Sequence, residues 1–82
     1  MEVSKVERVF IMEQVAKLRR FKGYTQTDMA TILGISLQGY WKKENGITKF
    51  SDSEKVKLLE VFREDFPDLT IGKIFYPESI KS

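Results

Sequence analysis

The stretch TQTDMATILGISLQGYWKKE, residues 25–44, most constrains what this chain can fold into. Thr25 is a favourable N-cap residue, and the apolar residues after it recur at helical spacing, which predicts a helix over residues 26–33. These apolar residues are Met29, Ala30, Ile32 and Leu33. Gly34 is expected to end this helix, because glycine adopts a left-handed backbone conformation without a clash at Cβ.

A second short helix is predicted over residues 37–44, with Ser36 as its N-cap. Two helices joined by so short a turn must cross steeply, and Ala30 is the small residue that permits their close approach. Tyr40 should point from the second helix toward the first. Gly39 lies inside the second helix, where it costs about 1 kcal/mol relative to alanine. We interpret it either as a site where another molecule approaches the backbone closely or as a point where the free helix frays.

Composition limits the fold and the chemistry that are possible. With 82 residues and 41% hydrophobic content, the chain has room for one small domain, residues 1–82, with one core. The sequence has no cysteine or histidine, so disulfides, thiol nucleophiles and the commonest metal ligand are missing. We therefore expect that the protein is not an enzyme and that it binds neither a metal ion nor a cofactor. The sequence shows neither a membrane span nor a signal peptide, which predicts a cytoplasmic protein.

Basic residues are concentrated around the two short helices. Residues 17–49 carry seven Lys or Arg against two Asp or Glu, a net charge of +5, whereas the whole chain has only +2. A one-sided basic patch is the electrostatic footprint of a protein that binds duplex nucleic acid. The alternative is that these lysines and arginines are simply solvated on amphipathic helices.

Three further helices are predicted, at about residues 6–22, 52–66 and 71–75. Ser4 with Glu7 is a possible capping box for the first, although residues 3–10 are also rich enough in β-branched residues to form an extended arm. Ser51 with Glu54 should cap the fourth helix, and Thr70 the last. A loose tail follows from about residue 78. The predicted fold class is therefore all-α: a compact bundle of about five helices and no sheet.

The runs LRRFKGYTQTDMATILGIS and YWKKENG resemble the helix-turn-helix of the Cro/repressor-type (lambda-repressor-like) DNA-binding family. The positions that carry the resemblance are Thr25-Gln26, Ala30, Gly34-Ile35-Ser36, Tyr40 and Glu44-Asn45-Gly46. The match covers roughly residues 11–62. It implies a small sequence-specific regulator of transcription of the phage or prophage type that represses as a homodimer on double-stranded DNA.

In this docking geometry the N-terminal half of the second motif helix enters the major groove, which makes Leu37, Gln38 and Lys42 the expected base readers. Gln38 can pair with adenine, Lys42 can donate to guanine, and Leu37 can rest on a thymine methyl group. The alternative is that these three side chains only face solvent, an interpretation that suits Leu37 least.

The resemblance also implies a phosphate-binding role for Gln26, at a helix N-terminus where free N–H groups favour an anion. Its alternative role is plain solvation. Weaker phosphate candidates are Thr25, Ser36, Asn45, Thr48 and Lys49. Arg19 and Glu44 match family positions that form a structural ion pair. Arg20 and Lys22 are expected to add to the electrostatic field rather than to any one contact.

Trp41 departs from the family pattern, which usually has a small or polar residue there. We expect this large aromatic side chain to be covered, by the C-terminal helix, the N-terminal segment or a second subunit. If Trp41 faces the duplex instead, the choice of base readers shifts by one residue.

A second class of function remains open, a protein-interaction module of the same fold, such as an antitoxin or co-regulator, for which exposed Leu37 and Trp41 would be suited. An enzymatic role is rejected, because the carboxylates near the end of the fourth helix fit a solvated face. These carboxylates are Glu60, Glu64, Asp65 and Asp68.

Overall fold

The computed structural model describes the backbone of residues 5–76 and the side chains of residues 13–76. Within that range it consists of helices, turns and loops, with no strand. The helices are α1 (Lys5–Phe21), α2 (Gln26–Leu33), α3 (Leu37–Glu44), α4 (Asp52–Phe62) and α5 (Ile71–Phe75). The predicted all-α fold class is confirmed, and the bounds predicted for α2, α3 and α5 agree with the structure.

Hydroxyl side chains begin four of these helices. Each N-cap side chain accepts a hydrogen bond from the backbone N–H three residues later, which satisfies one of the donors left free at a helix N-terminus. The caps are Thr25, Ser36, Ser51 and Thr70. At Ser51 the bond is reciprocated by Glu54, so the predicted capping box is present.

The turn between α2 and α3 spans only residues 34–36. Gly34 has φ 71° and ψ 33°, in the left-handed region. Its N–H donates to the carbonyl of Thr31 at 3.1 Å, and the N–H of Ile35 donates to the carbonyl of Ala30 at 3.0 Å. This pair of bonds satisfies the carbonyls at the end of α2 and fixes the direction in which the chain enters α3.

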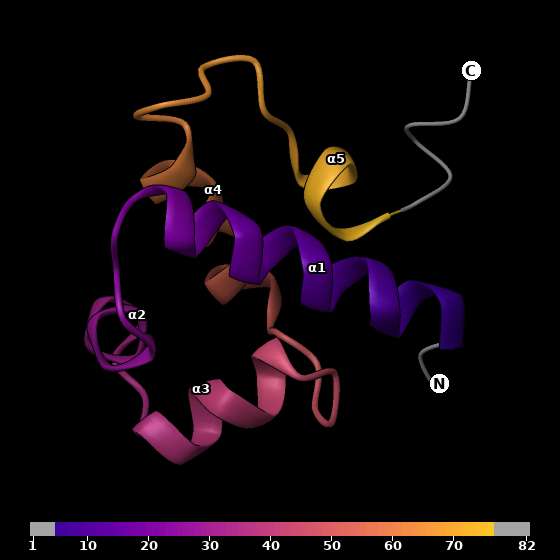
Figure 1. Cartoon of the computed structure of the whole chain (residues 1–82), viewed down its shortest axis with the longest axis vertical. Coiled ribbons are helices and arrows are strands. Elements are labelled where there is room, and N and C mark those ends of the chain that lie inside the picture. Colours follow the sequence, from indigo (N-terminus) through magenta and orange to yellow (C-terminus); the bar gives the residue numbers. More distant parts are fainter. Residues whose placement is uncertain (1–4, 77–82) are drawn as a thin grey trace.

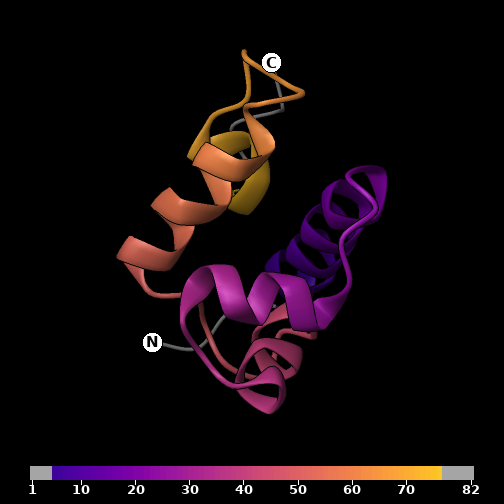
Figure 2. The same ribbon diagram turned by 90° about the vertical axis from the view of Figure 1, so that its left-hand side faces the viewer.

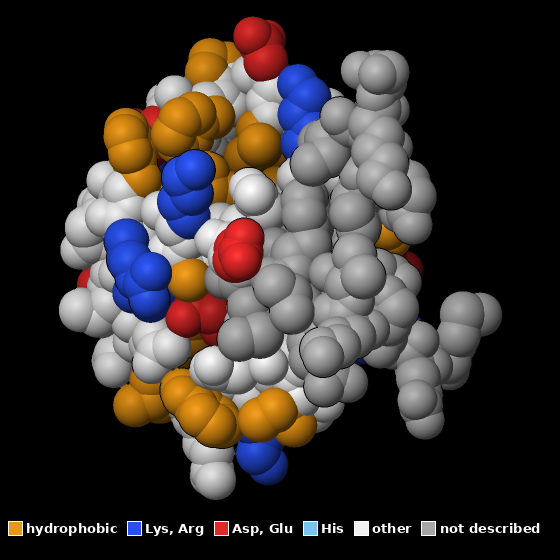
Figure 3. All heavy atoms as spheres, turned by 45° about the vertical axis from the view of Figure 1, so that its right-hand side comes forward, with side chains coloured by type: hydrophobic (Ala, Val, Ile, Leu, Met, Phe, Trp, Pro, Cys, Tyr) orange, Lys and Arg blue, Asp and Glu red, His pale blue; other side chains and the backbone are white. Residues whose placement is uncertain are grey.

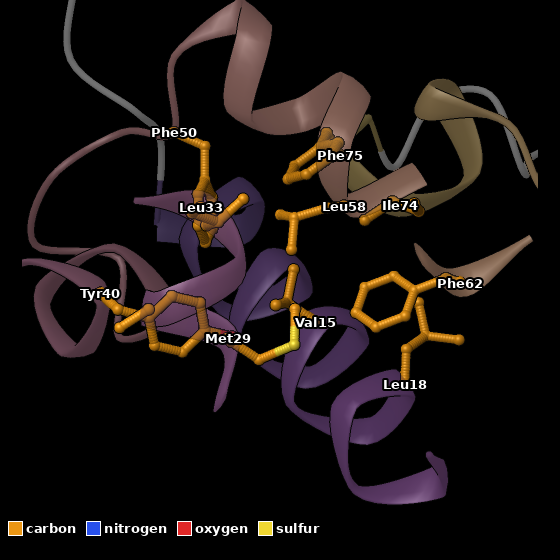
Figure 4. Packing of buried hydrophobic residues seen from close by; sticks show 11 residues of the cluster. Val15, Leu18, Met29, Leu33, Tyr40, Phe50, Leu58, Phe62, Ile74 and Phe75 are labelled. Atoms are coloured by element: carbon orange, nitrogen blue, oxygen red, sulfur yellow. The ribbon is translucent and has the colours of Figure 1, made fainter. Parts of the chain in front are cut away.

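All five helices contribute to one core. Figure 4 shows Val15 and Leu18 of α1 converging with Met29 of α2 and Phe62 of α4, all of them buried. The other members of the cluster are Ala30, Leu33, Tyr40, Phe50, Leu58, Ile74 and Phe75. α1 packs against α3 and α5, while α2 packs against α3 and α4 (Figures 1 and 2). The arrangement leaves α3 at one end of the molecule, with its outer side uncovered.

The first helix is one continuous element that begins at Lys5. Residues 5–10 are therefore helical, and the alternative of an extended arm is wrong for them. Ser4, its proposed capping box and the predicted tail from residue 78 lie outside the described residues.

The fourth helix is shorter than predicted, because it ends at Phe62 rather than at Phe66. Pro67 disfavours the α conformation at Phe66 alone, and residues 63–65 before it already form a turn, in which the N–H of Asp65 donates to the carbonyl of Phe62, three residues back, at 3.2 Å. The N–H of Phe66 still donates to the carbonyl of Phe62 at 3.0 Å. The carbonyl of Val61 accepts a bond from Lys22 Nζ at 3.2 Å.

Replacing Gly34 by alanine should destabilise the fold by about 1–2 kcal/mol, the penalty for a side chain in the left-handed region. Apart from the adjoining residues, a Cβ atom at this position would meet nothing within 4 Å, so the backbone conformation alone carries the penalty. Urea unfolding followed by circular dichroism measures the effect. Gly34→Asn is the control, because asparagine tolerates this conformation better; an alanine variant as stable as wild type would contradict the explanation.

Candidate nucleic-acid interface

The carboxylate of Glu44, at the end of α3, joins three helices. Arg19 of α1 donates to it twice, from Nε at 2.8 Å and from a terminal nitrogen at 3.2 Å. The hydroxyl of Tyr40 donates to it at 2.6 Å, and the side-chain amide of Gln26, at the start of α2, donates at 2.9 Å. Each carboxylate oxygen thus accepts two hydrogen bonds, and the expected pair of Arg19 with Glu44 is present.

This carboxylate is buried and nevertheless charged. Burial by itself raises the pKa of Glu44, but the hydrogen bonds from Arg19, Tyr40 and Gln26 outweigh burial and leave that pKa below its ordinary value. The bond to Glu44 raises the pKa of Arg19, and burial raises the pKa of Tyr40, so both remain donors at neutral pH. The cluster, which we call the Glu44 network, holds α3 against α1 and α2.

A second ion pair fixes the same C-terminal end of α3 to another helix. Lys43 Nζ donates to Glu54 at 2.6 Å, and Glu54 also accepts from the backbone N–H of Ser51 at 2.7 Å. Burial raises the pKa of Glu54, but these two bonds lower it by more, so the carboxylate stays charged. The pair links the last turn of α3 to the first turn of α4.

The three predicted base readers are all exposed on α3. Tyr40 and Glu44 point into the protein, and Lys42 is two residues from each, about 200° around the helix, so it points outward. Gln38 precedes Lys42 by one turn and is exposed, and Leu37 is 49% exposed. Gln38 and Lys42 therefore share the outward side, whereas Leu37, five residues before Lys42 and about 140° from it around the helix, is exposed on the flank of α3.

The candidates for phosphate contacts flank that surface. The hydroxyls of Thr25 and Ser36 accept bonds from backbone N–H groups, and neither donates its hydrogen to any residue that the structure describes. The side-chain amide of Asn45 donates to the carbonyl of Trp41 at 2.9 Å and so closes the end of α3. Thr48 and Lys49 are exposed in the loop that follows.

Gln26 is neither merely solvated nor wholly available for a phosphate. One of its amide hydrogens is used by Glu44, while its carbonyl oxygen and second hydrogen have no hydrogen-bond partner within the part of the chain that the structure describes. The contact brings the N-terminus of α2 to the C-terminal end of α3.

Gly39 serves the cap of its own helix. It lies within α3, and its N–H donates to Ser36 Oγ at 2.9 Å. A Cβ atom at position 39 would stand 3.0 Å from that same oxygen, closer than most such contacts. The absence of a side chain therefore leaves room for the cap, a reason that the sequence pattern did not indicate.

Lys22 forms ion pairs that the sequence analysis did not predict. It was expected to add only to the electrostatic field, but its Nζ contacts Glu64 at 2.8 Å and Asp65 at 2.9 Å, and its side chain is only 7% exposed. The bonds to Glu64 and Asp65 raise the pKa of Lys22. Two of the carboxylates assigned to a solvated face thus hold the end of α1 against the end of α4.

Ion pairs neutralise some, but not all, of the basic residues at positions 17–49. Of the basic residues at positions 17–49, Arg19, Lys22 and Lys43 are in ion pairs. Four others form no ion pair with any described side chain, and all four are exposed. These are Lys17, Arg20, Lys42 and Lys49.

Trp41 is not covered by the C-terminal helix α5, one of the covers expected for it within the chain. It is 45% exposed, although only the side chains of residues 13–76 are described. Leu37 lies one turn before it on the same flank of α3, and Ile47 in the following loop is also exposed. Figure 3 shows hydrophobic side chains gathered at the lower end of the molecule, where Figure 1 places α3 and this loop.

Among the described residues, no helix is both long and apolar enough to cross a bilayer, and no group of three His, Cys, Asp or Glu residues is placed to hold a metal ion.

No protein-family model, curated protein or solved structure matches the chain.

Most of the site residues were indicated by the sequence, but two partners of Glu44 were not assigned to it. Tyr40 stands four residues before Glu44, a spacing at which helical side chains meet, and this signal was available. No comparable signal pointed to the bond from Gln26, which joins two helices.

Removal of the Glu44 carboxylate should destabilise the protein by about 3–5 kcal/mol, because Arg19 would remain buried without its counter-charge. We expect this loss for Glu44→Ala in urea unfolding. Glu60→Ala, which removes an exposed carboxylate from α4, is the matched control and should change the free energy of unfolding by less than about 0.5 kcal/mol. Equal effects of the two substitutions would contradict the role assigned to Glu44.

Acid should destabilise the fold through Glu44 and Glu54. Both have a folded pKa below the ordinary 4.5, so their contribution is fully present above about pH 4.5 and is lost as the pH falls through the folded pKa values. With no histidine in the chain, we expect little change between about pH 5 and 8.

Urea unfolding at a series of pH values measures this dependence. Glu44→Gln, which cannot ionise at this position, should show a shallower decline below pH 4.5 than wild type. Parallel curves for the two proteins would show that Glu44 does not titrate as described.

Proposed function

We propose that this chain is a sequence-specific double-stranded DNA-binding regulator of transcription, a cytoplasmic repressor that reads the major groove with α3. The observation that carries the proposal is the contrast between the two sides of α3. Its inner side is fixed by Glu44 and Tyr40, while its outer side exposes Gln38 and Lys42. A reading helix needs both properties, because direct readout requires polar groups held at fixed positions toward the base edges.

Charge supports the same function. Lys42 on α3 and Lys49 in the loop after it are exposed and form no ion pair with any side chain that the structure describes, and the only carboxylate at positions 37–49 is the buried Glu44. This surface favours a polyanion, since lysines near phosphates release counterions when they bind duplex DNA.

The resemblance of residues 11–62 to the Cro/repressor-type family agrees with this assignment. In that geometry the N-termini of α2 and α3 approach the phosphates, where Gln26, Thr25 and Ser36 have donors to offer. We further propose that the protein binds as a homodimer, because two half-sites about one helical turn apart supply the affinity that one small domain lacks.

A second candidate function, a protein-interaction module with weak or no DNA binding, is favoured by one observation. Leu37 and Trp41 form an exposed apolar patch on α3, and such patches mark interaction sites on soluble proteins. An antitoxin or co-regulator of this fold would cover the patch with its partner.

The test is to enrich duplexes from a randomised pool with the wild-type protein and to measure their binding by fluorescence anisotropy over a salt series. We expect preference for the enriched duplex over a random one, and a steep loss of affinity with salt. Lys42→Ala should weaken binding to the enriched duplex by about 1–3 kcal/mol and reduce that preference.

Lys57→Ala is the matched control, since it removes one exposed lysine from α4. Gln26→Ala should weaken binding to both duplexes alike, after circular dichroism has established that the variant is folded. If no duplex is enriched, or if Lys42→Ala and Lys57→Ala behave alike, the protein-interaction function becomes the better explanation.

A further inference from the structure

Trp41 is a large exposed side chain that neither the core nor the Glu44 network uses. It lies between Tyr40, which points into the protein, and Lys42, which points outward. Its side chain therefore lies on the flank of α3, between the inner and the outer side of the helix. Leu37, one turn earlier, shares this flank, and the two form a continuous apolar ridge.

The charges around the ridge limit what can cover it. Lys42 adjoins the ridge and is exposed, Lys49 is exposed in the following loop, and Glu44 is buried inside its network. Within residues 37–49 an approaching molecule therefore meets apolar surface and positive charge, and no accessible carboxylate. The fitting occupant is an anionic partner that carries small apolar groups close to its charges.

The major groove of duplex DNA has this composition. Its walls are phosphates, and the 5-methyl group of thymine is the apolar group on its base edges. 5-Methylcytosine places the same methyl group at the same ring position.

We propose that Trp41, together with Leu37, recognises 5-methylpyrimidines in the major groove and so determines part of the sequence specificity of this protein. This inference rests on the proposed DNA-binding function and adds a ligand class to it. Trp41 supplies the larger apolar surface, while Lys42 directs the helix toward the polar base edges and phosphates. Specificity then depends on a methyl group as well as on hydrogen bonds.

The experiment uses the duplex enriched from the randomised pool and the same duplex with each thymine replaced in turn by deoxyuridine, which removes only the methyl group. In a second arm, each cytosine is replaced by 5-methylcytosine. For wild type we expect one or more thymine replacements to weaken binding by about four-fold, the effect of one buried methyl group. Sensitivity confined to the 5-methylcytosine arm would support the same recognition with that base as its source.

Trp41→Ala should lose this sensitivity and bind the thymine and deoxyuridine duplexes alike, whereas Trp41→Phe should retain most of it. Val56→Ala is the control, because it shortens an exposed apolar side chain on α4. A Trp41→Ala protein that still distinguishes the methylated from the unmethylated base overturns the inference.

A second readout needs no substitution, since Trp41 is the only tryptophan of the chain. Its fluorescence should shift to shorter wavelength and become protected from acrylamide when the enriched duplex binds. Binding by anisotropy without a change at Trp41 overturns the inference and leaves the DNA-binding function in place. The absence of binding to every duplex overturns the proposed function and this inference with it.

Discussion

One buried carboxylate joins three helices of this structure. Glu44 would be unfavourable in the interior on its own, yet it accepts four hydrogen bonds from three side chains and remains ionised. Because the partners of Glu44 belong to α1, α2 and α3, the network fixes both the angle at which α2 and α3 cross and the distance between them. Apolar packing around Met29 and Phe62 is less directional, so it would stabilise the bundle without setting the direction in which α3 points.

The division of α3 into two sides follows from this arrangement. Among the described residues every buried side-chain nitrogen and oxygen has a hydrogen-bond partner, whereas Gln38 and Lys42 on the outer side of α3 are exposed. The caps reinforce this order: Ser36 begins the helix, and Gly39 leaves space for that cap. The ion pair between Lys43 and Glu54 then ties the helix to α4. These contacts fix the position of α3 relative to α1, α2 and α4, so a partner of its outer side would not have to order the helix on binding.

Local signals in the sequence were sufficient for most of the fold. N-cap hydroxyls and Gly34 act within a few residues, so the bounds of α2 and α3 could be predicted from them. The end of α4 was predicted wrongly because the helical spacing of apolar residues continues to Phe66. Pro67 disfavours the α conformation at Phe66, and the helix ends before that residue, at Phe62. The partners of Lys22 and Gln26, and the exposure of Trp41, depend on how distant helices pack. Sequence patterns do not contain that information.

The most direct test of the claim that the outer side of α3 meets DNA is an amide chemical-shift titration of the isotope-labelled protein with the enriched duplex. The largest changes should fall on residues 36–42, the indole N–H of Trp41 and the first turn of α2, with little change in α5. Changes centred on α4 and α5, or no change at saturating duplex, would contradict the claim.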